Sequence, residues 1–210
     1  MKKYVQYGCG LSAPPEWENY DVSPTLRIQK TPVIGKLLKG SLNTSFPENV
    51  KYGNIVSGLP VEENSCDGIY SSHTLEHLSF KDFDLALKNT FKILKPRGKF
   101  RCIVPDLEIL ARNYVKALDN GDVIAGEAFI RSTLMGTVER PQGLKAVLSS
   151  IFGNSNHLWM WDSLGFKNKL TAVGFTELRD CSFNDSVDPM FKLVEDKDRF
   201  ENAIAIECTK

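Results

Sequence analysis

The chain has no excess of charge of either sign. Its 210 residues include 26 lysines and arginines and 26 aspartates and glutamates, so its formal net charge is zero. Proteins that bind nucleic acid usually present a basic surface that neutralises phosphates. The charge balance therefore argues against nucleic acid as the main partner.

Paired cysteines and long apolar runs are also missing. The five cysteines are scattered and odd in number: Cys9, Cys66, Cys102, Cys181 and Cys208. No C-x-x-C pair or regular spacing indicates zinc or a disulfide framework, so no metal is expected and the compartment is predicted to be reducing, as in the cytoplasm. No apolar run approaches the roughly 20 residues of a membrane helix, and no apolar segment follows "MKK", so neither membrane contact nor a secretory signal is expected.

What the chain does contain is an alternation of β-prone and helical segments. Strands are expected at residues 3–7, 18–22, 51–56, 66–72 and 99–106, and a final pair at 176–183 and 202–210. Helices are expected at residues 32–40, 80–95, 107–152 and 161–174. This order predicts an α/β protein with a Rossmann-like, mostly parallel seven-stranded sheet, helices on both faces and an antiparallel C-terminal strand. We expect one domain spanning residues 1–210.

Helix 80–95 has the clearest local signals. Ser79 followed by Asp82 predicts an N-terminal cap, and apolar residues then recur on one helical face: Phe83, Leu87, Phe91 and Leu94. Pro96 ends the helix, and "KPRG" predicts a turn into the next strand.

Polar or glycine residues follow the first five predicted strands. The strand ends read "YGCG", "NYD", "GNI", "SSH" and "VPD". Parallel strands of an open α/β sheet present their carboxyl ends at one edge, where ligands bind. A dinucleotide-dependent oxidoreductase would show G-x-G-x-x-G at the first of these turns, but Ala13 stands at the sixth position and two prolines follow it. That class is therefore disfavoured, and a plain turn at Gly8 and Gly10 remains an alternative.

The central stretch, "LPVEENSCDGIYSSHTLEHLSFKDFDLALKNTFKILKPRGKFRCIVPD", resembles class I S-adenosylmethionine-dependent methyltransferases of the small-molecule group. That family carries "LPF", "SFD", "LEH", "LKPGG" and "PD" in the same order and at similar spacing. The likeness runs from "YGCG" to the final strand pair, and "EWENYD" and "NHLWMWD" look similar to a subgroup in which "GCG" is followed quickly by "GW-N-D". Gln6, Ser12, Asn54 and Arg97 depart from the family pattern.

The resemblance implies S-adenosylmethionine as cofactor and supplies its candidate ligands: Tyr7, Gly8, Cys9, Gly10, Asp21, Val22, Asn54, Ile55, Ser71 and Ser72. The glycines would let the backbone approach the methionine part. The Asp21 carboxylate would accept hydrogen bonds from both ribose hydroxyls. Val22, Asn54 and Ile55 would contact the adenine, and the two serines would line the methionine end.

Methyl transfer from a sulfonium is an in-line displacement that depends mainly on alignment in a dry site. A base is required only for a hydroxyl or a protonated amine acceptor, and the candidates are His73, Asp106 and His157. Glu76 and His77 of "LEH" are interpreted as structural. Residues 107–161 are expected to cover the site, with His157 or Trp159 near the acceptor.

The expected partner is a small-molecule or sugar methyl acceptor, whose identity and acceptor atom the sequence does not specify. The oligomeric state is left open as well. A catalytically inactive relative that binds the cofactor or a partner is the alternative function.

Overall fold

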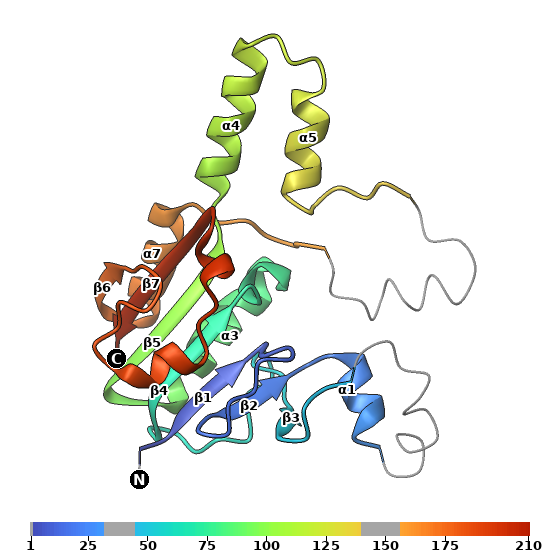
Figure 1. The fold of residues 1–210 in the computed structure, drawn as a ribbon. Helices are drawn as coiled ribbons and strands as arrows, with labels where there is room; N and C mark the ends of the chain where they lie inside the picture. Colours follow the sequence, from blue (N-terminus) through green and yellow to red (C-terminus); the bar gives the residue numbers. More distant parts are fainter. Residues whose placement is uncertain (1, 32–44, 140–155) are drawn as a thin grey trace.

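The computed structural model describes residues 2–31, 45–139 and 156–210, which contain a seven-stranded sheet with the order β3-β2-β1-β4-β5-β7-β6 (Figure 1). The strands are β1 (Tyr4–Tyr7), β2 (Glu18–Asp21), β3 (Val50–Tyr52), β4 (Cys66–Ser72), β5 (Leu94–Pro105), β6 (Thr176–Asp180) and β7 (Ala203–Thr209). Strands β1 to β5 pair in parallel, and β7 lies antiparallel between β5 and β6. The predicted Rossmann-like sheet is confirmed. The expected helix at 32–40 lies outside the described residues.

The helices are α1 (Pro24–Gln29), α3 (Phe80–Ile93), α4 (Leu107–Asp119), α5 (Ala125–Ser132) and α7 (Ser163–Val173). Three short 3₁₀ helices complete the described elements: η1 (Leu75–His77), η2 (Pro189–Leu193) and η3 (Lys197–Phe200). Helix α3 begins as predicted, because the Asp82 backbone N–H donates to the Ser79 hydroxyl at 3.3 Å. Helix α7 ends at Gly174, whose φ of +117° suits glycine.

Helices α3 and α7 cover one face of the sheet. Phe83 and Leu87 of α3 and Phe166 and Leu170 of α7 are fully buried in the largest apolar cluster. The amphipathic pattern of α3 therefore predicts its packing face correctly. Burial of each of these side chains contributes roughly 1.5–3 kcal/mol.

The opposite face is covered by the segment that contains η2 and η3, together with Trp17. No helix connects β1 to β2; Trp17 from this short connection lies 5.6 Å from the Phe191 ring and donates through its indole nitrogen to the Met190 carbonyl at 3.1 Å. Proline residues and this anchor hold a connection that is too short for a helix. The carboxyl end of β2 therefore lies beside that of β1 despite the missing helix.

The "KPRG" turn is part of the long strand β5. Between the pairs Cys66–Leu94 and Gly68–Lys99 the register shifts, so β5 holds three more residues than β4 there. Arg97 adopts a left-handed φ of +67° within this irregularity. A glycine would adopt this conformation with less strain.

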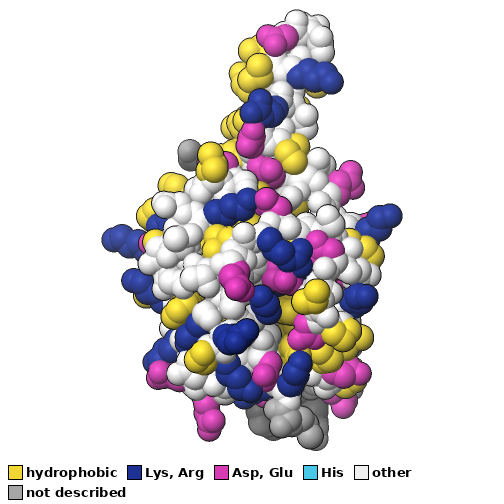
Figure 2. All heavy atoms as spheres, turned by 90° about the vertical axis from the view of Figure 1, so that its left-hand side faces the viewer, with side chains coloured by type: hydrophobic (Ala, Val, Ile, Leu, Met, Phe, Trp, Pro, Cys, Tyr) yellow, Lys and Arg dark blue, Asp and Glu magenta, His cyan; other side chains and the backbone are white. Residues whose placement is uncertain are grey.

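Helices α4 and α5 form an arm that stands away from the sheet (Figure 1). Tyr114 and Phe129 pack between them at 5.2 Å, and no residue of α4 is buried. Figure 2 shows hydrophobic side chains on this arm and both signs of charge mixed over the body below it. None of the described helices is long and apolar enough to cross a membrane.

Candidate functional site

A cavity of about 1030 Å³ lies at the carboxyl ends of β1, β2 and β4. This volume is at the upper end of the range for small-molecule sites. Nine of the ten residues predicted to bind the cofactor line it: Tyr7, Gly8, Cys9, Gly10, Asp21, Val22, Asn54, Ile55 and Ser72. Ser71 is buried behind the wall and its hydroxyl has no hydrogen-bond partner among the described residues.

The glycine turn after β1 requires its glycines. Gly8 and Gly10 have φ values of +66° and +54°, in the left-handed region that residues with a Cβ rarely adopt. A Cβ on Gly8 would lie 1.9 Å from the Thr74 hydroxyl oxygen, whereas a Cβ on Gly10 would meet no atom within 4 Å. Gly8 thus permits close packing, and Gly10 leaves backbone open toward the cavity that it lines.

Asp21 closes this turn from the end of β2. One carboxylate oxygen accepts from the Gly10 backbone N–H at 2.9 Å, and the other accepts from the Ser23 backbone N–H at 2.7 Å. Each oxygen has a second lone pair. The carboxylate can therefore hold the turn and still accept hydrogen bonds from a ligand in the cavity.

Gln6, one of the departures from the family pattern, organises the same turn. Its side-chain nitrogen donates to the Ser12 carbonyl at 2.7 Å and to the Asn19 side chain. Gln6 and Asn19 are both buried. A neutral amide here fixes the loop without placing a charge behind the cavity.

The loop after β3 forms the third side of the cavity. Asn54 accepts through its side-chain oxygen from the Val56 backbone N–H at 2.9 Å. Asn89 of α3 donates to the Ile55 and Val56 carbonyls at 2.8 and 2.9 Å, which fastens the loop to the main body. The Asn54 side chain is thereby oriented with its amide N–H groups available as donors.

Residues near the C-terminus form a fourth side of the cavity that the sequence pattern does not predict: Val194, Asp196 and Arg199 line the cavity from the η2–η3 segment. Arg101 of β5 anchors this segment. Its fully buried guanidinium forms ion pairs with Glu195, with Glu207 at 3.3 Å and with Asp185 at 2.9 Å. The charged sequence of this segment does not predict that it lines the cavity, because its contacts with Arg101 form only in the folded chain.

His73 follows β4 and lines the cavity. Its φ of +49° is unusual for a residue with a side chain, and such strained backbone often occurs at functional sites. Its Nε2 lies 2.9 Å from the Arg199 carbonyl, and its Nδ1 lies 3.4 Å from the nearer Glu76 oxygen. Burial opposes protonation, but the Glu76 carboxylate beside Nδ1 and the Arg199 carbonyl at Nε2 outweigh it and raise the pKa of His73.

The other two catalytic candidates do not line the cavity. Asp106 caps α4, where its carboxylate accepts from the Glu108 backbone N–H at 2.8 Å. His157 is buried, with its Nε2 at 4.0 Å from Glu76, and burial lowers its pKa. His77, interpreted from the sequence as structural, does line the cavity.

The expected cover over the cavity is not formed by the described part of residues 107–161. No residue of α4 or α5 lines the cavity. Trp161 is buried against Phe83 at 4.4 Å, and Trp159 is half exposed over Phe80 at 4.9 Å. Trp161 therefore belongs to the apolar core, whereas Trp159 lies at the surface.

A comparison with protein families matches residues 32–102 to the family described as "Methyltransferase domain". A search of curated proteins gave no match. Among solved structures, a SAM-dependent methyltransferase, possible histamine N-methyltransferase, from Thermotoga maritima is similar, with 16% identity, a TM-score of 0.52 and coverage of 100% of this chain and 83% of that chain. A SAM-dependent methyltransferase from Archaeoglobus fulgidus has 14% identity, a TM-score of 0.48 and coverage of 100% and 86%.

At these identities, structural similarity establishes the fold alone. The family match covers the central stretch that holds β3, β4, α3 and most of β5. The chain is therefore similar to the methyltransferase domain family in sequence over residues 32–102, and to a SAM-dependent methyltransferase in fold.

Proposed function

We propose that the chain binds S-adenosylmethionine in the cavity and transfers its methyl group to a small-molecule or sugar acceptor. The observation that carries this proposal is the convergence of residues from three strand ends on one cavity, with the open glycine turn and the Asp21 carboxylate side by side. That arrangement offers backbone groups to an amino acid part and a carboxylate to a vicinal diol. We further propose that residues 1–210 act as one methyltransferase domain.

Asp21 is assigned to the ribose hydroxyls. Both carboxylate oxygens are fixed by backbone N–H groups, so binding a diol would require little reordering of the side chain. The neighbouring Val22 and Ile55 side chains would pack on the adenine ring. The Asn54 amide, oriented by its bond to Val56, would donate to a ring nitrogen.

The methionine part is assigned to the turn formed by Tyr7, Gly8, Cys9 and Gly10. Ser72 lines the cavity next to this turn, and Ser71 lies buried with a hydroxyl that has no hydrogen-bond partner among the described residues. S-adenosylmethionine supplies an activated methyl group when bound. The residues around it have to orient the acceptor and exclude water.

His73 is the residue of the three catalytic candidates that reaches the cavity, so we place the acceptor on its side. Asp106 and His157 would contribute indirectly, through the start of α4 and through Glu76 respectively. The five cysteines are free thiols, which favours a reducing compartment such as the cytoplasm.

Calorimetric titration with S-adenosylmethionine and S-adenosylhomocysteine, followed by assays of S-adenosylhomocysteine release against a panel of acceptors, tests the proposal. We expect saturable binding, a rise in the melting temperature and turnover with at least one acceptor class. The absence of heat and of a thermal shift at millimolar ligand would refute cofactor binding. Tight binding without turnover on any acceptor would instead favour a catalytically inactive cofactor-binding protein.

A further inference from the structure

All three histidines of the chain gather around one buried glutamate. Glu76, His77 and His157 each offer one ligand atom, and these atoms all lie within 4.8 Å of one another. His73 adds the third imidazole, with Nδ1 at 3.4 Å from the nearer Glu76 oxygen. Residues separated by about 80 positions in sequence thus surround a single carboxylate.

The Glu76 carboxylate has no hydrogen-bond partner in the described part of the chain. The side chain is 1% exposed, and neither of its oxygens forms a hydrogen bond to the described residues. A buried carboxylate is unstable in its charged form without a neighbouring cation, and in its neutral form it needs an acceptor for its proton. Glu76 therefore needs a neighbouring cation, and the two candidates are a protonated His73 and a bound metal ion.

Two of the imidazoles are oriented as metal ligands commonly are. His77 Nδ1 lies 3.0 Å from the Asn156 carbonyl, and His73 Nε2 lies 2.9 Å from the Arg199 carbonyl. A carbonyl only accepts, so these nitrogens carry the protons. In the neutral rings, the other nitrogen of each histidine then has a free lone pair, as in metal-binding histidines that donate to a backbone carbonyl. The lone pair on His73 faces a carboxylate oxygen, which is repulsive unless a cation or a proton lies between them.

The backbone holds the two halves of the cluster together. The Glu76 carbonyl accepts from the Leu158 and Trp159 N–H groups at 2.8 and 3.1 Å, and the His157 N–H donates to the Leu134 carbonyl at 3.1 Å. The cluster is therefore built before any ion binds, which lowers the ordering cost of binding.

We propose that Glu76, His77 and His157 bind a divalent first-row transition-metal ion, such as Zn²⁺, Mn²⁺ or Fe²⁺, with His73 as an additional ligand. One carboxylate with two or three imidazoles is a ligand set for these ions, whereas Mg²⁺ and Ca²⁺ prefer sites made of oxygen atoms. A small inward movement of the side chains would bring the ligand atoms to bonding distances.

The proposed metal site adjoins the cavity, because two of its histidines, His73 and His77, also line the cavity. A tetrahedral ion held by three protein ligands keeps a fourth position for an exogenous ligand, and a six-coordinate ion held by four protein ligands keeps two. That position would take an oxygen donor of the acceptor, such as a hydroxyl group. This assignment rests on the proposed methyl transfer, whereas the metal site itself does not.

Titration of chelator-treated protein with Co²⁺, followed by visible absorption, tests the metal site without the cofactor. We expect one equivalent to bind, without strong thiolate bands, and Zn²⁺ to displace it. Glu76→Gln and His157→Gln should each weaken binding by at least about tenfold. Glu127→Gln is the matched control, because this exposed carboxylate on α5 pairs only with Arg131 in the described structure.

The absence of stoichiometric Co²⁺ binding at millimolar concentration would overturn the proposal, as would equal binding by Glu76→Gln and the parent. Thermal unfolding gives a second test. In chelator, Glu76→Gln should be at least as stable as the parent, because it removes an unpaired buried carboxylate, and Zn²⁺ should raise the melting temperature of the parent alone. A variant that is much less stable in chelator, together with a parent that does not respond to Zn²⁺, would show that a protonated His73 is the cation.

Discussion

Replacing Asp21 with alanine would remove a carboxylate that is expected to serve both the glycine turn and the ribose. Its two oxygens accept from the Gly10 and Ser23 backbone N–H groups at 2.9 and 2.7 Å. The substitution therefore leaves two N–H groups of the turn without partners, in addition to removing the proposed ribose ligand. We expect losses of both stability and cofactor affinity.

The two losses can be estimated from hydrogen bonds to a charged group, at roughly 1.5–3 kcal/mol each. Asp21 is half-buried, so the lower value applies to its backbone bonds, and the free energy of unfolding should fall by about 2–3 kcal/mol. Loss of the two ribose bonds, at the same lower value of about 1.5 kcal/mol each, should weaken S-adenosylhomocysteine binding about 100-fold or more. Asp21→Asn should be milder, because the amide oxygen can still accept.

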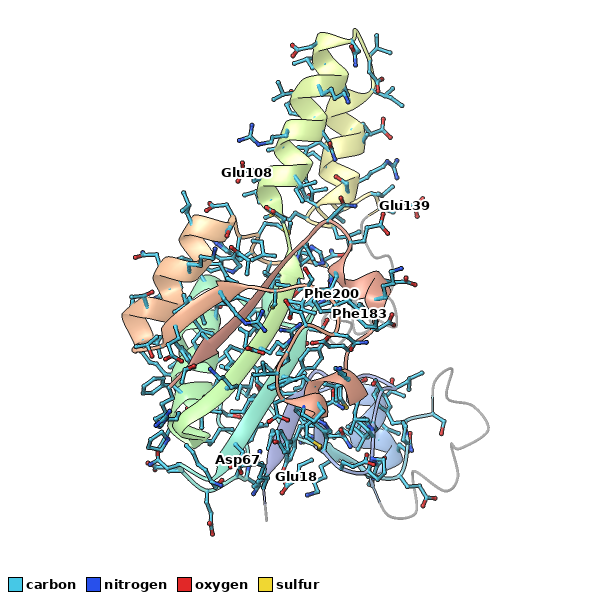
Figure 3. The ribbon with its side chains drawn as sticks, turned by 60° about the vertical axis from the view of Figure 1, so that its left-hand side comes forward. Glu18, Asp67, Glu108, Glu139, Phe183 and Phe200 are labelled. Carbon is cyan, nitrogen blue, oxygen red and sulfur yellow. The ribbon has the colours of Figure 1, made fainter. Side chains whose placement is uncertain are left out.

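The assay is calorimetric titration of S-adenosylhomocysteine and of its 2′,3′-dideoxy analogue, under conditions where each variant is folded. If Asp21 binds the ribose, Asp21→Ala should lose affinity for the parent ligand but little for the analogue. Asp67→Ala is the control: Asp67 also accepts a backbone N–H, from Lys3 at 2.8 Å, but lies at the opposite edge of the sheet (Figure 3). Equal losses for both ligands, or unchanged binding by a folded Asp21→Ala protein, would refute a direct role in ribose binding.

Gly8→Ala should destabilise the protein more than Gly10→Ala in urea unfolding, because the new Cβ at position 8 would lie 1.9 Å from the Thr74 hydroxyl oxygen. Gly10→Ala adds only the strain of a left-handed backbone, about 1–2 kcal/mol. Equal losses of stability would contradict the geometry of the glycine turn. Arg101→Leu should lower the free energy of unfolding by about 3–5 kcal/mol, because it leaves buried carboxylates unpaired, and a loss under 1 kcal/mol would contradict this. Burial alone would raise the pKa of Asp185, but hydrogen bonds from two arginines and a backbone N–H hold it at about 2. The ionised Asp185 carboxylate should therefore contribute about 1 kcal/mol to the free energy of unfolding, after allowance for its exposure. This contribution is present above about pH 4 and is lost as the pH falls toward 2. In Asp185→Asn, the free energy of unfolding should change less over this pH range.

Local sequence was sufficient for the elements that obey short-range rules. Strand β4 has the predicted bounds, and α3 begins at its Ser79 cap because capping and one-sided apolar spacing act within a few residues. The glycine turn and Asp21 could be placed together because neighbouring parallel strands bring their carboxyl ends to one edge. The order of strands along the chain therefore predicted most of the cavity lining.

Other features depended on contacts between residues that are distant in sequence. Asp196 and Arg199 reach the cavity because Arg101 holds their segment through Glu195, and a sequence pattern does not encode that pairing. No residue of α4 or α5 lines the cavity, and the arm that they form stands away from the sheet (Figure 1), although its helical pattern alone is compatible with a cover.

The "LEH" motif is the clearest example of a feature whose surroundings depend on residues distant in sequence. From the sequence, Glu76 and His77 were interpreted as a structural pair beside a helix, and His157 was a separate candidate base. Backbone bonds from residues 158 and 159 to the Glu76 carbonyl bring His157 to the carboxylate, and burial removes the water that would otherwise solvate it. The sheet, its strand ends and the glycine turn could be predicted from the sequence, because they follow from local periodicity and strand order. The charged groups that are buried together could not, because burial and pairing depend on the packing of the whole chain.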